Sequence, residues 1–370
     1  MRVSEYMEQA ELFKGVVALI EDANTIAICA HTSPDGDAIG SGLALAEVIR
    51  TAWPGKRVTN LLADKDPVPR IYRFLPGSDT FVHAVDYDVT PDLFICVDLS
   101  QMSRLADAEK ICARAHHVAV LDHHPSGERF WEAGVVRPDA AATGVIISEF
   151  CLHSSRVLTP TIAQNLLCAI VTDTGRFQYQ NADSEAFETA SMLVEAGASP
   201  AEVALNVYQS DRLAYVHLAA RVLARIQTFA EGRIAYSFAT AEDIANAGVT
   251  LDELDGLIDL VRCIEGTQVA LFLKEVDGGK VRGNLRSKCD LDVSGIAREM
   301  GGGGHRAAAG FTASGTVDEV RAIVLPKLCA LFDGDAALSS APKADVRGAS
   351  RGGAGSRAIP PPSASTSPAE

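Results

Sequence analysis

Three short apolar runs alternate with helix-like segments in the first half of the chain, and this alternation constrains the fold more than any other feature. The runs cover residues 25–30, 93–97 and 118–121 and are rich in Ile, Val, Leu, Phe and Cys. Residues 41–51 place apolar side chains at helical spacing, and residues 161–173 have the character of a buried helix. Strands that alternate with helices form βαβ units with parallel strands. The sequence therefore predicts an α/β fold whose N-terminal domain is a mostly parallel sheet flanked by helices.

The pattern changes near residue 228, which predicts a second and smaller domain. Residues 199–227 have the character of a helical connector. The later segments with a clear preference are residues 234–238 and 269–273 for strands, and residues 241–262 and 292–300 for helices. Strands and helices mixed in this way predict a small mixed α/β domain.

The last segment of the chain has a composition that does not form a packed core. Residues 336–370 contain 9 Ala, 7 Ser, 5 Pro and 4 Gly and no aromatic residue. Such a segment buries too little apolar surface to offset the entropy lost on ordering, so we expect a disordered C-terminal tail. The predicted parts of the chain are a first domain at 1–198, the connector at 199–227, a second domain at 228–335 and the tail at 336–370.

Charge, hydropathy and cysteine usage exclude several classes of protein. The chain carries 33 basic and 48 acidic residues, a formal net charge of −15, and such a surface repels long nucleic acid. It contains no run of 18 apolar residues and starts with a polar, acidic segment, so we expect a cytoplasmic protein without a membrane anchor or signal peptide. The 8 cysteines include no C-x-x-C pair, which favours reduced thiols over disulfides or a zinc site. The sequence leaves a homodimer open.

Residues that bind metals follow the predicted strands directly, and one more ends the buried helix. The candidates are His31, Asp35, Asp37, Asp98, Asp122, His123, His124 and Asp173. Because the carboxyl ends of parallel strands meet at one edge of a sheet, we expect these side chains to converge. The four aspartates outside the 122–124 cluster carry a charge of −4, which two divalent cations balance, and neutral His31 and His123 complete the ligand set. Oxygen ligands with some imidazole and no thiolate favour Mn²⁺, with Mg²⁺ as the alternative.

Each of these residues also has an ordinary structural explanation when taken alone. An aspartate after a strand is often the N-cap of the next helix, which would explain Asp37 or Asp98. Paired histidines are often surface residues, as we expect for His116 and His117. A calcium loop of the EF-hand type is excluded because no glutamate stands eleven positions after Asp35. The combination, at equivalent strand ends, is what points to a two-metal site.

A glycine-rich stretch in the second domain is the other candidate binding element. Residues 301–304 are consecutive glycines, and His305 follows them. We expect this run to precede a helix and to expose backbone N–H groups, a combination that binds phosphate. Arg286, Lys288 and His305 add a local basic cluster to an acidic protein. The alternative, a flexible linker, is disfavoured by the apolar residues on both sides.

These motifs resemble those of the DHH phosphoesterase superfamily. The family motif H-x-x-P-D-x-D-x-x-G-S is matched by residues 31–41, and the naming motif D-H-H by residues 122–124. The second domain is similar to the DHH-associated C-terminal domain, through an R-S element at residues 286–287 and the sequence G-G-G-H-x-x-A-A-G at residues 302–310. The resemblance covers about residues 10–330. It therefore implies that the first domain binds metals and the second binds substrate.

The resemblance also implies a role for each candidate residue. The metal ligands are His31 and Asp35 for one ion, Asp37, His123 and Asp173 for the other, and Asp98 as the bridge. The residues implied in catalysis are Asp98, His124, which would face the substrate phosphate, and Asp122, which would orient a neighbouring histidine. The residues implied in substrate binding are Arg104, Arg286, Ser287, Gly303, Gly304 and His305.

Some positions depart from the family pattern. Leu99 follows Asp98 where the family often has Thr, and Ala141 and Ala142 stand where it often has Ser-Ser. Asn284 occupies a position that is frequently Ser. We interpret these differences as affecting substrate preference rather than catalysis.

Within the superfamily, the motifs are most similar to the group of bifunctional oligoribonucleases and pAp phosphatases. The resemblance implies a two-metal enzyme that hydrolyses short 5′-phosphorylated oligoribonucleotides to mononucleotides and pAp to AMP and phosphate. Its partners would be short oligoribonucleotides and small phosphorylated nucleotides. Two alternatives stay open: a soluble phosphodiesterase for cyclic dinucleotides or pApA, and a non-catalytic nucleotide sensor. The second is disfavoured because all six predicted metal ligands are present.

Overall fold

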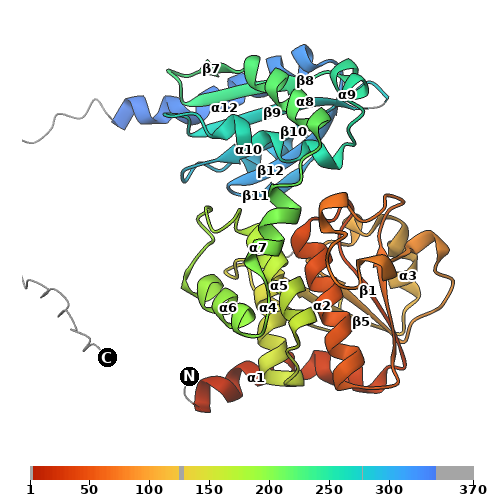
Figure 1. Cartoon of the computed structure of the whole chain (residues 1–370). Coiled ribbons are helices and arrows are strands. Elements are labelled where there is room, and N and C mark those ends of the chain that lie inside the picture. The colour runs from red at the N-terminus through yellow and green to blue at the C-terminus, as the bar shows by residue number, and fades with distance from the viewer. Residues whose placement is uncertain (1–2, 125–128, 277, 339–370) are drawn as a thin grey trace, which may run out of the picture.

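The first domain is built on a six-stranded sheet in which all strands are parallel, as the sequence predicts (Figure 1). The structure is a computed structural model that describes residues 3–124, 129–276 and 278–338. In spatial order, the strands are β3 (Val82–His83), β2 (Arg57–Leu62), β1 (Thr25–Cys29), β4 (Leu93–Val97), β5 (His117–Asp122) and β6 (Ala133–Val136).

Both faces of this sheet are buried, which explains why its central strands are apolar throughout. Along β1, Ile26 and Ile28 point into one core, and Ala27 and Cys29 point into a second core on the opposite face. The helices of this domain are α1 (Val3–Asp22), α2 (Gly36–Ala52), α3 (Glu109–Arg114), α4 (Thr143–Phe150), α5 (Pro160–Asp173) and α6 (Ser184–Glu195). The first core is covered by α1, α2, α4, α5 and α6, and the second by α3 and short turns.

The order of the strands places the predicted metal ligands together. After β1 the chain continues to β2 on one side, whereas after β4 it continues to β5 on the other side. The carboxyl ends of β1 and β4, which pair directly, therefore form the point at which the strand order reverses. Open parallel sheets bind ligands at such a point. Residues 31–37 and Asp98 both emerge there.

A close approach of α2 and α5 brings the remaining ligand to the same place. A Cβ atom at Gly40 would lie 2.4 Å from the carbonyl oxygen of Asn165, so only glycine permits this separation. The two helices meet with the start of α2, next to Asp35, near the end of α5, where Gly36 lies against Thr172. This explains the glycine of the H-x-x-P-D-x-D-x-x-G-S motif and carries Asp173 toward the strand ends.

The connector is helical and the second domain has mixed α/β character, as the sequence predicts. The connector contains α7 (Pro200–Val203), the π-helical turn η7 (Ala204–Tyr208) and α8 (Leu213–Ala224). The second sheet has the order β11 (Gly303–His305), β12 (Ala308–Ser314), β10 (Lys280–Ser287), β9 (Val269–Val276), β8 (Ile234–Ala239) and β7 (Gln227–Phe229). Its helices are α9 (Ala241–Ala247), α10 (Leu257–Arg262), α11 (Ser294–Glu299) and α12 (Val317–Leu338). One face packs on α11 and α12, and the other on α8, α9 and α10.

The prediction that the glycine run precedes a helix is wrong. The run leads into the hairpin formed by β11 and β12, in which Gly304 has φ of 136° and pairs with Ala309. The alanines after His305 favour a helix locally, but Ala309 and Phe311 alternate into the core of the second domain while β12 pairs with β10. Tertiary packing therefore overrides helix propensity here, and no helix begins directly after the run.

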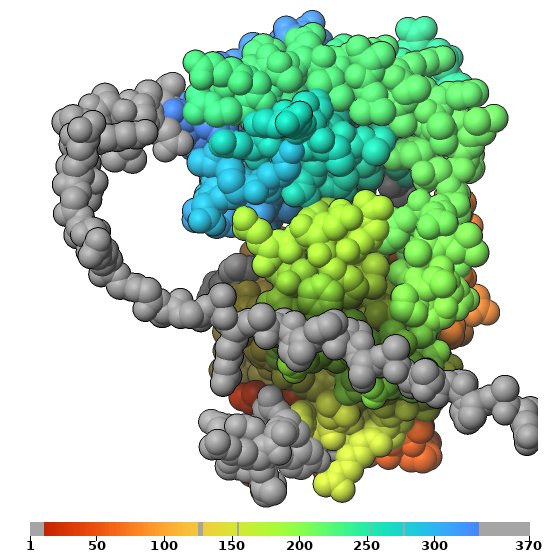
Figure 2. All heavy atoms as spheres, turned by 60° about the vertical axis from the view of Figure 1, so that its left-hand side comes forward, coloured from red at the N-terminus to blue at the C-terminus, as the bar shows by residue number. Residues whose placement is uncertain are grey.

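The second domain rests on the first. In Figure 2, its green-to-blue surface lies against the yellow-green part of the first domain. Helix α12 extends to Leu338, into the start of the predicted tail, and the rest of that tail lies outside the described residues. Among the helices of the described ranges, none is long and apolar enough to cross a membrane.

Candidate active site

Asp98 belongs to three groups of potential metal ligands, and two of them lie at the carboxyl ends of β1 and β4. The first of these two contains His31, Asp35 and Asp98, and the second contains Asp37, Asp98 and His123, while the third group joins Asp98 to Asp122 and His124. Within each group the ligand atoms lie within 4.8 Å of one another. Asp98 Oδ2 is 3.3 Å from His31 Nε2, whereas Asp98 Oδ1 is 3.4 Å from His123 Nε2. The two oxygens of one carboxylate thus face the two groups, which is the arrangement a bridging ligand requires.

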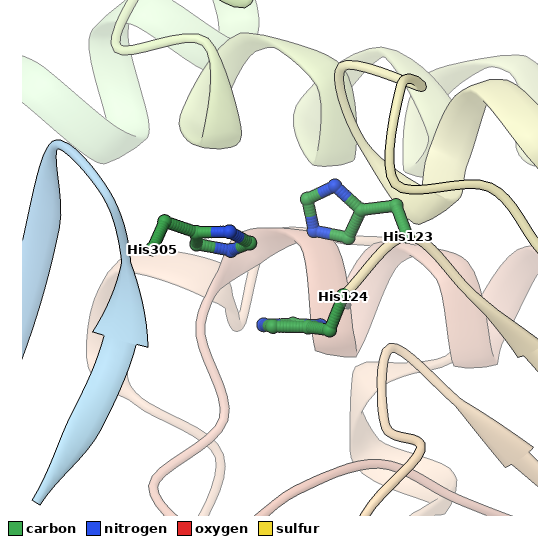
Figure 3. Close-up of side chains that lie close together, drawn as sticks. All are labelled: His123, His124 and His305. Atoms are coloured by element: carbon green, nitrogen blue, oxygen red, sulfur yellow. The ribbon is translucent and has the colours of Figure 1, made fainter. Parts of the chain in front are cut away.

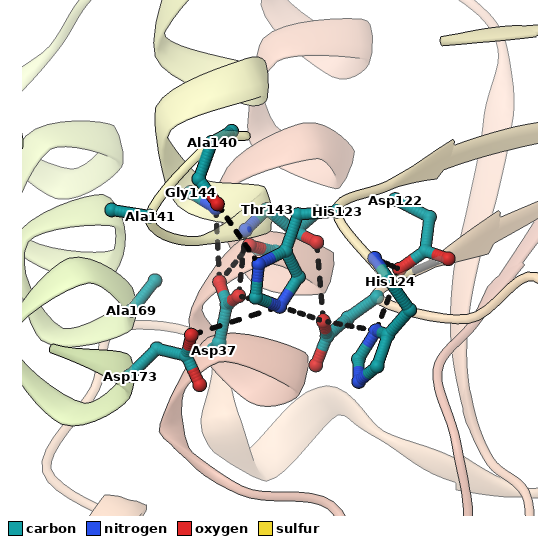
Figure 4. A network of polar contacts seen from close by, with 12 residues as sticks. Asp37, Asp122, His123, His124, Ala140, Ala141, Thr143, Gly144, Ala169 and Asp173 are labelled. Atoms are coloured by element: carbon teal, nitrogen blue, oxygen red, sulfur yellow. Dashed lines mark hydrogen bonds and ion pairs between the residues drawn. The ribbon is translucent and has the colours of Figure 1, made fainter. Parts of the chain in front are cut away.

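Asp173 lies beside the second group. Its Oδ2 atom is 3.6 Å from His123 Nε2, as Figure 4 shows. The six residues predicted as metal ligands therefore lie around one centre, although they come from four separate segments of the chain.

The two ligand histidines are oriented by backbone carbonyls. His31 Nδ1 lies 2.8 Å from the carbonyl oxygen of Thr32, and His123 Nδ1 lies 3.2 Å from that of Ala140. Because a carbonyl only accepts, each Nδ1 carries the proton and donates it. This leaves Nε2 of each ring, which faces the carboxylates, as the atom that can bind a metal, in the tautomer that a metal-binding histidine needs.

The N-terminus of α4 holds Asp37, a feature that our reading of the sequence missed. The backbone N–H groups of Thr143 and Gly144 donate to the fully buried Asp37 carboxylate at 2.6 and 2.9 Å, and Ser41 Oγ donates at 2.9 Å (Figure 4). The Thr143 hydroxyl donates to Asp98 Oδ1 at 3.1 Å. The sequence feature that could have revealed these contacts is the start of the helix, because the first N–H groups of a helix have no partner within it.

Asp35, rather than Asp37 or Asp98, is the N-cap of a helix. Asp35 Oδ1 accepts from the N–H groups of Asp37 and Ala38 at 3.0 and 3.1 Å, which caps α2. The cap and a metal-binding role are compatible, because a carboxylate has two oxygens. Asp98 instead follows β4 with φ of 55°, a strained conformation of the kind found at functional sites.

The electrostatics of this cluster fit divalent cations. Burial, followed by the charges of Asp37 and Asp35, raises the pKa of Asp98 well above its ordinary value. Burial opposes a charge on His123, but the carboxylates of Asp173, Asp98 and Asp37 outweigh it and raise the pKa of His123 to about 9. Without cations, the cluster therefore holds protons that its residues would not keep in water. Cations placed among these ligands would displace those protons and neutralise the carboxylates.

We expect the metal-free protein to lose stability as the pH rises. Burial is the main cause that raises the pKa of Asp173 from 3.8 to about 7, and the carboxylates raise that of His123 from 6.5 to about 9. A raised pKa means that the folded state binds protons more tightly, so this stabilisation is present at low pH and is lost as the pH passes the folded value. Melting temperatures measured in chelator should fall between about pH 4 and pH 9.

Added Mn²⁺ should raise the melting temperature most at the high end of this range, where it competes with few protons. Asp173→Asn is the matched variant and should flatten the lower part of the profile. A metal-free wild-type protein whose melting temperature did not change with pH would contradict this account of the cluster.

His124 is held in place beside the metal ligands. Its Nδ1 lies 2.8 Å from Asp122 Oδ1, and its backbone N–H donates to the same oxygen at 3.1 Å. Burial raises the pKa of Asp122, but its interactions with His124 outweigh burial and lower it. This geometry agrees with the predicted orienting role of Asp122, which remains a prediction.

Arg104 lies near the first ligand group. Its carbonyl accepts from the N–H of Thr32 at 3.1 Å, which fixes the turn that carries His31. After burial, the charge of Arg104 is the main cause that lowers the pKa of His31. The Arg104 side chain is half-buried beside this group.

The second domain reaches the site through His305. Its ring stacks on His124 with centroids 4.7 Å apart and lies 5.3 Å from His123, as Figure 3 shows. Burial, followed by the charges of His124 and His123, lowers the pKa of His305 to about 4, so its ring is neutral at pH 7. The glycine hairpin thus places a hydrogen-bonding side chain, rather than a helix N-terminus, above the metal ligands.

The other predicted substrate residues differ in how free their polar groups are. Ser287 is buried and donates to the carbonyl of Cys289, and Lys288 donates to the carbonyl of Ile264. Arg286 Nη1 donates to the carbonyl of Leu285, while its buried Nε has no hydrogen-bond partner among the described residues. Gly303 and Gly304 are exposed on β11. Of the basic cluster expected from the sequence, Arg286 therefore keeps one N–H group without a partner in the described part of the chain, whereas Lys288 already donates to a backbone carbonyl.

Comparisons with known proteins agree with this architecture. The chain matches the model of the DHH family, N-terminal domain, over residues 25–170 and that of the DHHA1 domain over residues 231–331. It is 31% identical over 315 residues to the bifunctional oligoribonuclease and PAP phosphatase NrnA of Thermus thermophilus. The aligned region covers 84% of this chain and 90% of that protein. It is 27% identical over 291 residues to the protein of the same name from Bacillus subtilis, covering 78% of this chain and 88% of that one.

The fold also resembles a solved structure. An exopolyphosphatase-related protein from Bacteroides fragilis superimposes with a TM-score of 0.79 at 23% sequence identity, covering 89% of this chain and 97% of that chain. This similarity concerns the fold alone.

Proposed function

Because the chain belongs to the DHH family of phosphoesterases and carries a DHHA1 domain, we propose that it hydrolyses short 5′-phosphorylated oligoribonucleotides to mononucleotides, and pAp to AMP and phosphate. The observation that carries the proposal is the position of Asp98, whose two oxygens face two ligand groups, together with the contact of His305 from the second domain with the neighbouring His124 and His123. This arrangement supports a site in which a metal pair and a nucleotide-binding domain act on one phosphate.

The residues that would hold the cations are those of the two groups, with Mn²⁺ favoured over Mg²⁺ by the mixed carboxylate and imidazole ligands. When bound, such cations neutralise charge on the phosphate and lower the pKa of water so that it attacks at neutral pH. His31 and His123 would bind a cation through Nε2 as neutral imidazoles, because their Nδ1–H groups donate to the carbonyls of Thr32 and Ala140.

The remaining residues bind and orient the nucleotide. The ring of His124, held by Asp122, stacks on the ring of His305, so a phosphate bound beside these two rings would meet one histidine from each domain. The half-buried Arg286 would bind a 5′-phosphate from the second domain, and Arg104 would add positive charge next to His31 in the first domain. If a nucleotide follows the attacked phosphate, the product is a mononucleotide; if none follows, pAp yields AMP and phosphate.

Product analysis with a substrate panel tests this proposal. The panel contains 5′-phosphorylated 2- to 5-mers, a 30-mer, pAp, pApA, pyrophosphate and cyclic dinucleotides, each assayed with Mn²⁺ and with chelator. We expect rapid metal-dependent release of mononucleotides from the short RNAs and of phosphate from pAp. The 30-mer should be a poor substrate, because each added phosphate meets an acidic surface.

Other outcomes of the panel are equally informative. Preferred hydrolysis of cyclic dinucleotides or pApA would replace the proposed substrate class by the alternative one. Tight binding without any hydrolysis would indicate a nucleotide sensor. A 30-mer that was degraded as fast as a dimer would contradict the exclusion of long nucleic acid.

A further inference from the structure

The loop that follows Asp173 has an unusual backbone. Gly175, Arg176 and Phe177 have consecutive φ values of 55°, 63° and 59°. Side chains other than glycine rarely adopt this left-handed conformation, and two in succession persist only where surrounding contacts impose them. The contacts of this loop therefore help to decide where Asp173 lies.

Internal contacts make the loop a compact unit that includes Tyr179. The N–H groups of Gln178 and Tyr179 both donate to the carbonyl of Thr174 at 3.0 Å. A Cβ atom at Gly175 would lie 2.3 Å from the Tyr179 ring, so the ring rests directly on the backbone two residues from Asp173. Asn181 Nδ2 donates to the carbonyl of Asp173 at 3.1 Å. A displacement of Tyr179 is thus transmitted to the backbone of Asp173.

Tyr179 also contacts the second domain. Its hydroxyl donates to Asp259 Oδ1 at 3.0 Å, and the guanidinium of Arg262 lies 4.7 Å from the centre of its ring. Asp259 and Arg262 stand one turn apart on α10, with 3.7 Å between their charged atoms. Burial, followed by the negative charge of Asp259, raises the pKa of Tyr179, so the hydroxyl keeps the proton that it donates.

The segment that receives Tyr179 is anchored by other contacts. Glu253, just before α10, accepts two hydrogen bonds from Arg212 at 2.7 and 2.5 Å and lies 4.0 Å from Arg70 of the first domain. Asp255 pairs with the buried Lys274 at 2.6 Å. These ion pairs therefore hold residues 253–262 within the second domain, and Arg70 links the segment to the first domain.

We propose that Tyr179 is a positioning residue that couples the docking of the second domain on the first to the placement of the Asp173 carboxylate. The hydrogen bond to Asp259 holds the loop so that Asp173 Oδ2 faces His123 Nε2 at 3.6 Å. Without it, the strained loop relaxes and Asp173 leaves its place among the metal ligands. The inference rests on the proposed function, since it assumes that Asp173 serves a metal-dependent reaction.

A double-mutant cycle in the full-length protein tests this coupling. Tyr179→Phe keeps the ring on Gly175 and removes only the hydroxyl, whereas Asp259→Ala removes its acceptor. The measurements are kcat and KM for a 5′-phosphorylated dinucleotide and for bis(p-nitrophenyl) phosphate, and Mn²⁺ affinity from the electron paramagnetic resonance of free Mn²⁺. Tyr236→Phe, in the interior of the second domain, is the matched control and should behave like the wild type.

We expect each single variant to lose about tenfold in kcat on both substrates and about tenfold in Mn²⁺ affinity, with KM for the dinucleotide nearly unchanged. The double variant should be no worse than the singles, because both remove one interaction. A Tyr179→Phe enzyme with wild-type Mn²⁺ affinity would overturn the inference. So would a rise in KM for the dinucleotide with normal turnover of the generic ester, which indicates domain docking alone.

The two failures are distinguishable. If the wild type does not hydrolyse the dinucleotide or pAp, the proposed function is wrong, whereas the Mn²⁺ affinities and the generic ester still report on Tyr179. If the wild type is active and Tyr179→Phe is indistinguishable from it, only the coupling is wrong.

Discussion

Asp98→Asn should lower kcat on a 5′-phosphorylated dinucleotide by at least about 1000-fold, equal to about 4 kcal/mol of transition-state stabilisation. Asp98 Oδ2 and Oδ1 face His31 and His123 at 3.3 and 3.4 Å, so no other residue of the site serves both ligand groups. An asparagine keeps the size of the side chain but replaces one oxygen by an NH₂ group, which does not bind a cation. The measurement is single-turnover hydrolysis at saturating Mn²⁺, together with the number of Mn²⁺ ions bound.

The same variant should not be less stable without metal. Burial and neighbouring carboxylates raise the pKa of Asp98 well above its ordinary value, so the metal-free fold must either bury this charge or take up a proton, and a neutral asparagine avoids that cost. We expect its metal-free melting temperature to equal or exceed that of the wild type. Asp122→Asn is the comparison with a smaller expected effect. Its kcat on the dinucleotide should fall by about 10- to 100-fold, because Asp122 acts through His124. Two bound Mn²⁺ ions and retained turnover in Asp98→Asn would show that Asp98 is not a bridge.

His305→Ala should reduce kcat/KM for pAp and for 5′-phosphorylated dinucleotides by about 10- to 100-fold, the usual cost of losing a hydrogen bond to a charged group. His305 comes from the second domain and stacks on His124 at 4.7 Å, so it reaches a nucleotide held between the domains. Hydrolysis of bis(p-nitrophenyl) phosphate should be spared, because that ester needs only the first domain. Rates on both substrate classes, measured side by side, separate the two contributions.

His117→Ala is the matched control for His305→Ala. His117 pairs with Glu132 at the exposed start of β5, and its loss should change neither rate. An equal loss on the nucleotide and on the generic ester would mean that His305 acts on the metal centre itself. The idea of a separate substrate clamp would then have to be abandoned.

Local sequence patterns were sufficient to predict the parallel sheet and the cluster of candidate metal ligands. The apolar strands β1, β4 and β5 are each followed directly by candidate ligands, so the order of the segments carries both the fold and the candidate site. The edge of a parallel sheet then brings Asp98 and residues 31–37 together without further information. The orientation of His31 needed no long-range argument either, because the carbonyl of the next residue provides it, whereas His123 depends on the carbonyl of Ala140, 17 positions away.

The contacts that tune the centre were decided only by the tertiary structure. Asp37 is held by the N–H groups of Thr143 and Gly144, more than 100 positions along the chain, and Tyr179 meets Asp259 at a separation of 80. The glycine run shows the same limit, since its alanines favour a helix until β12 pairs with β10 and Phe311 enters the core. Sequence periodicity records which face of an element is apolar. It does not record which distant element covers that face, and packing alone settles whether His305 stacks on His124 or whether Asp173 is held from the second domain.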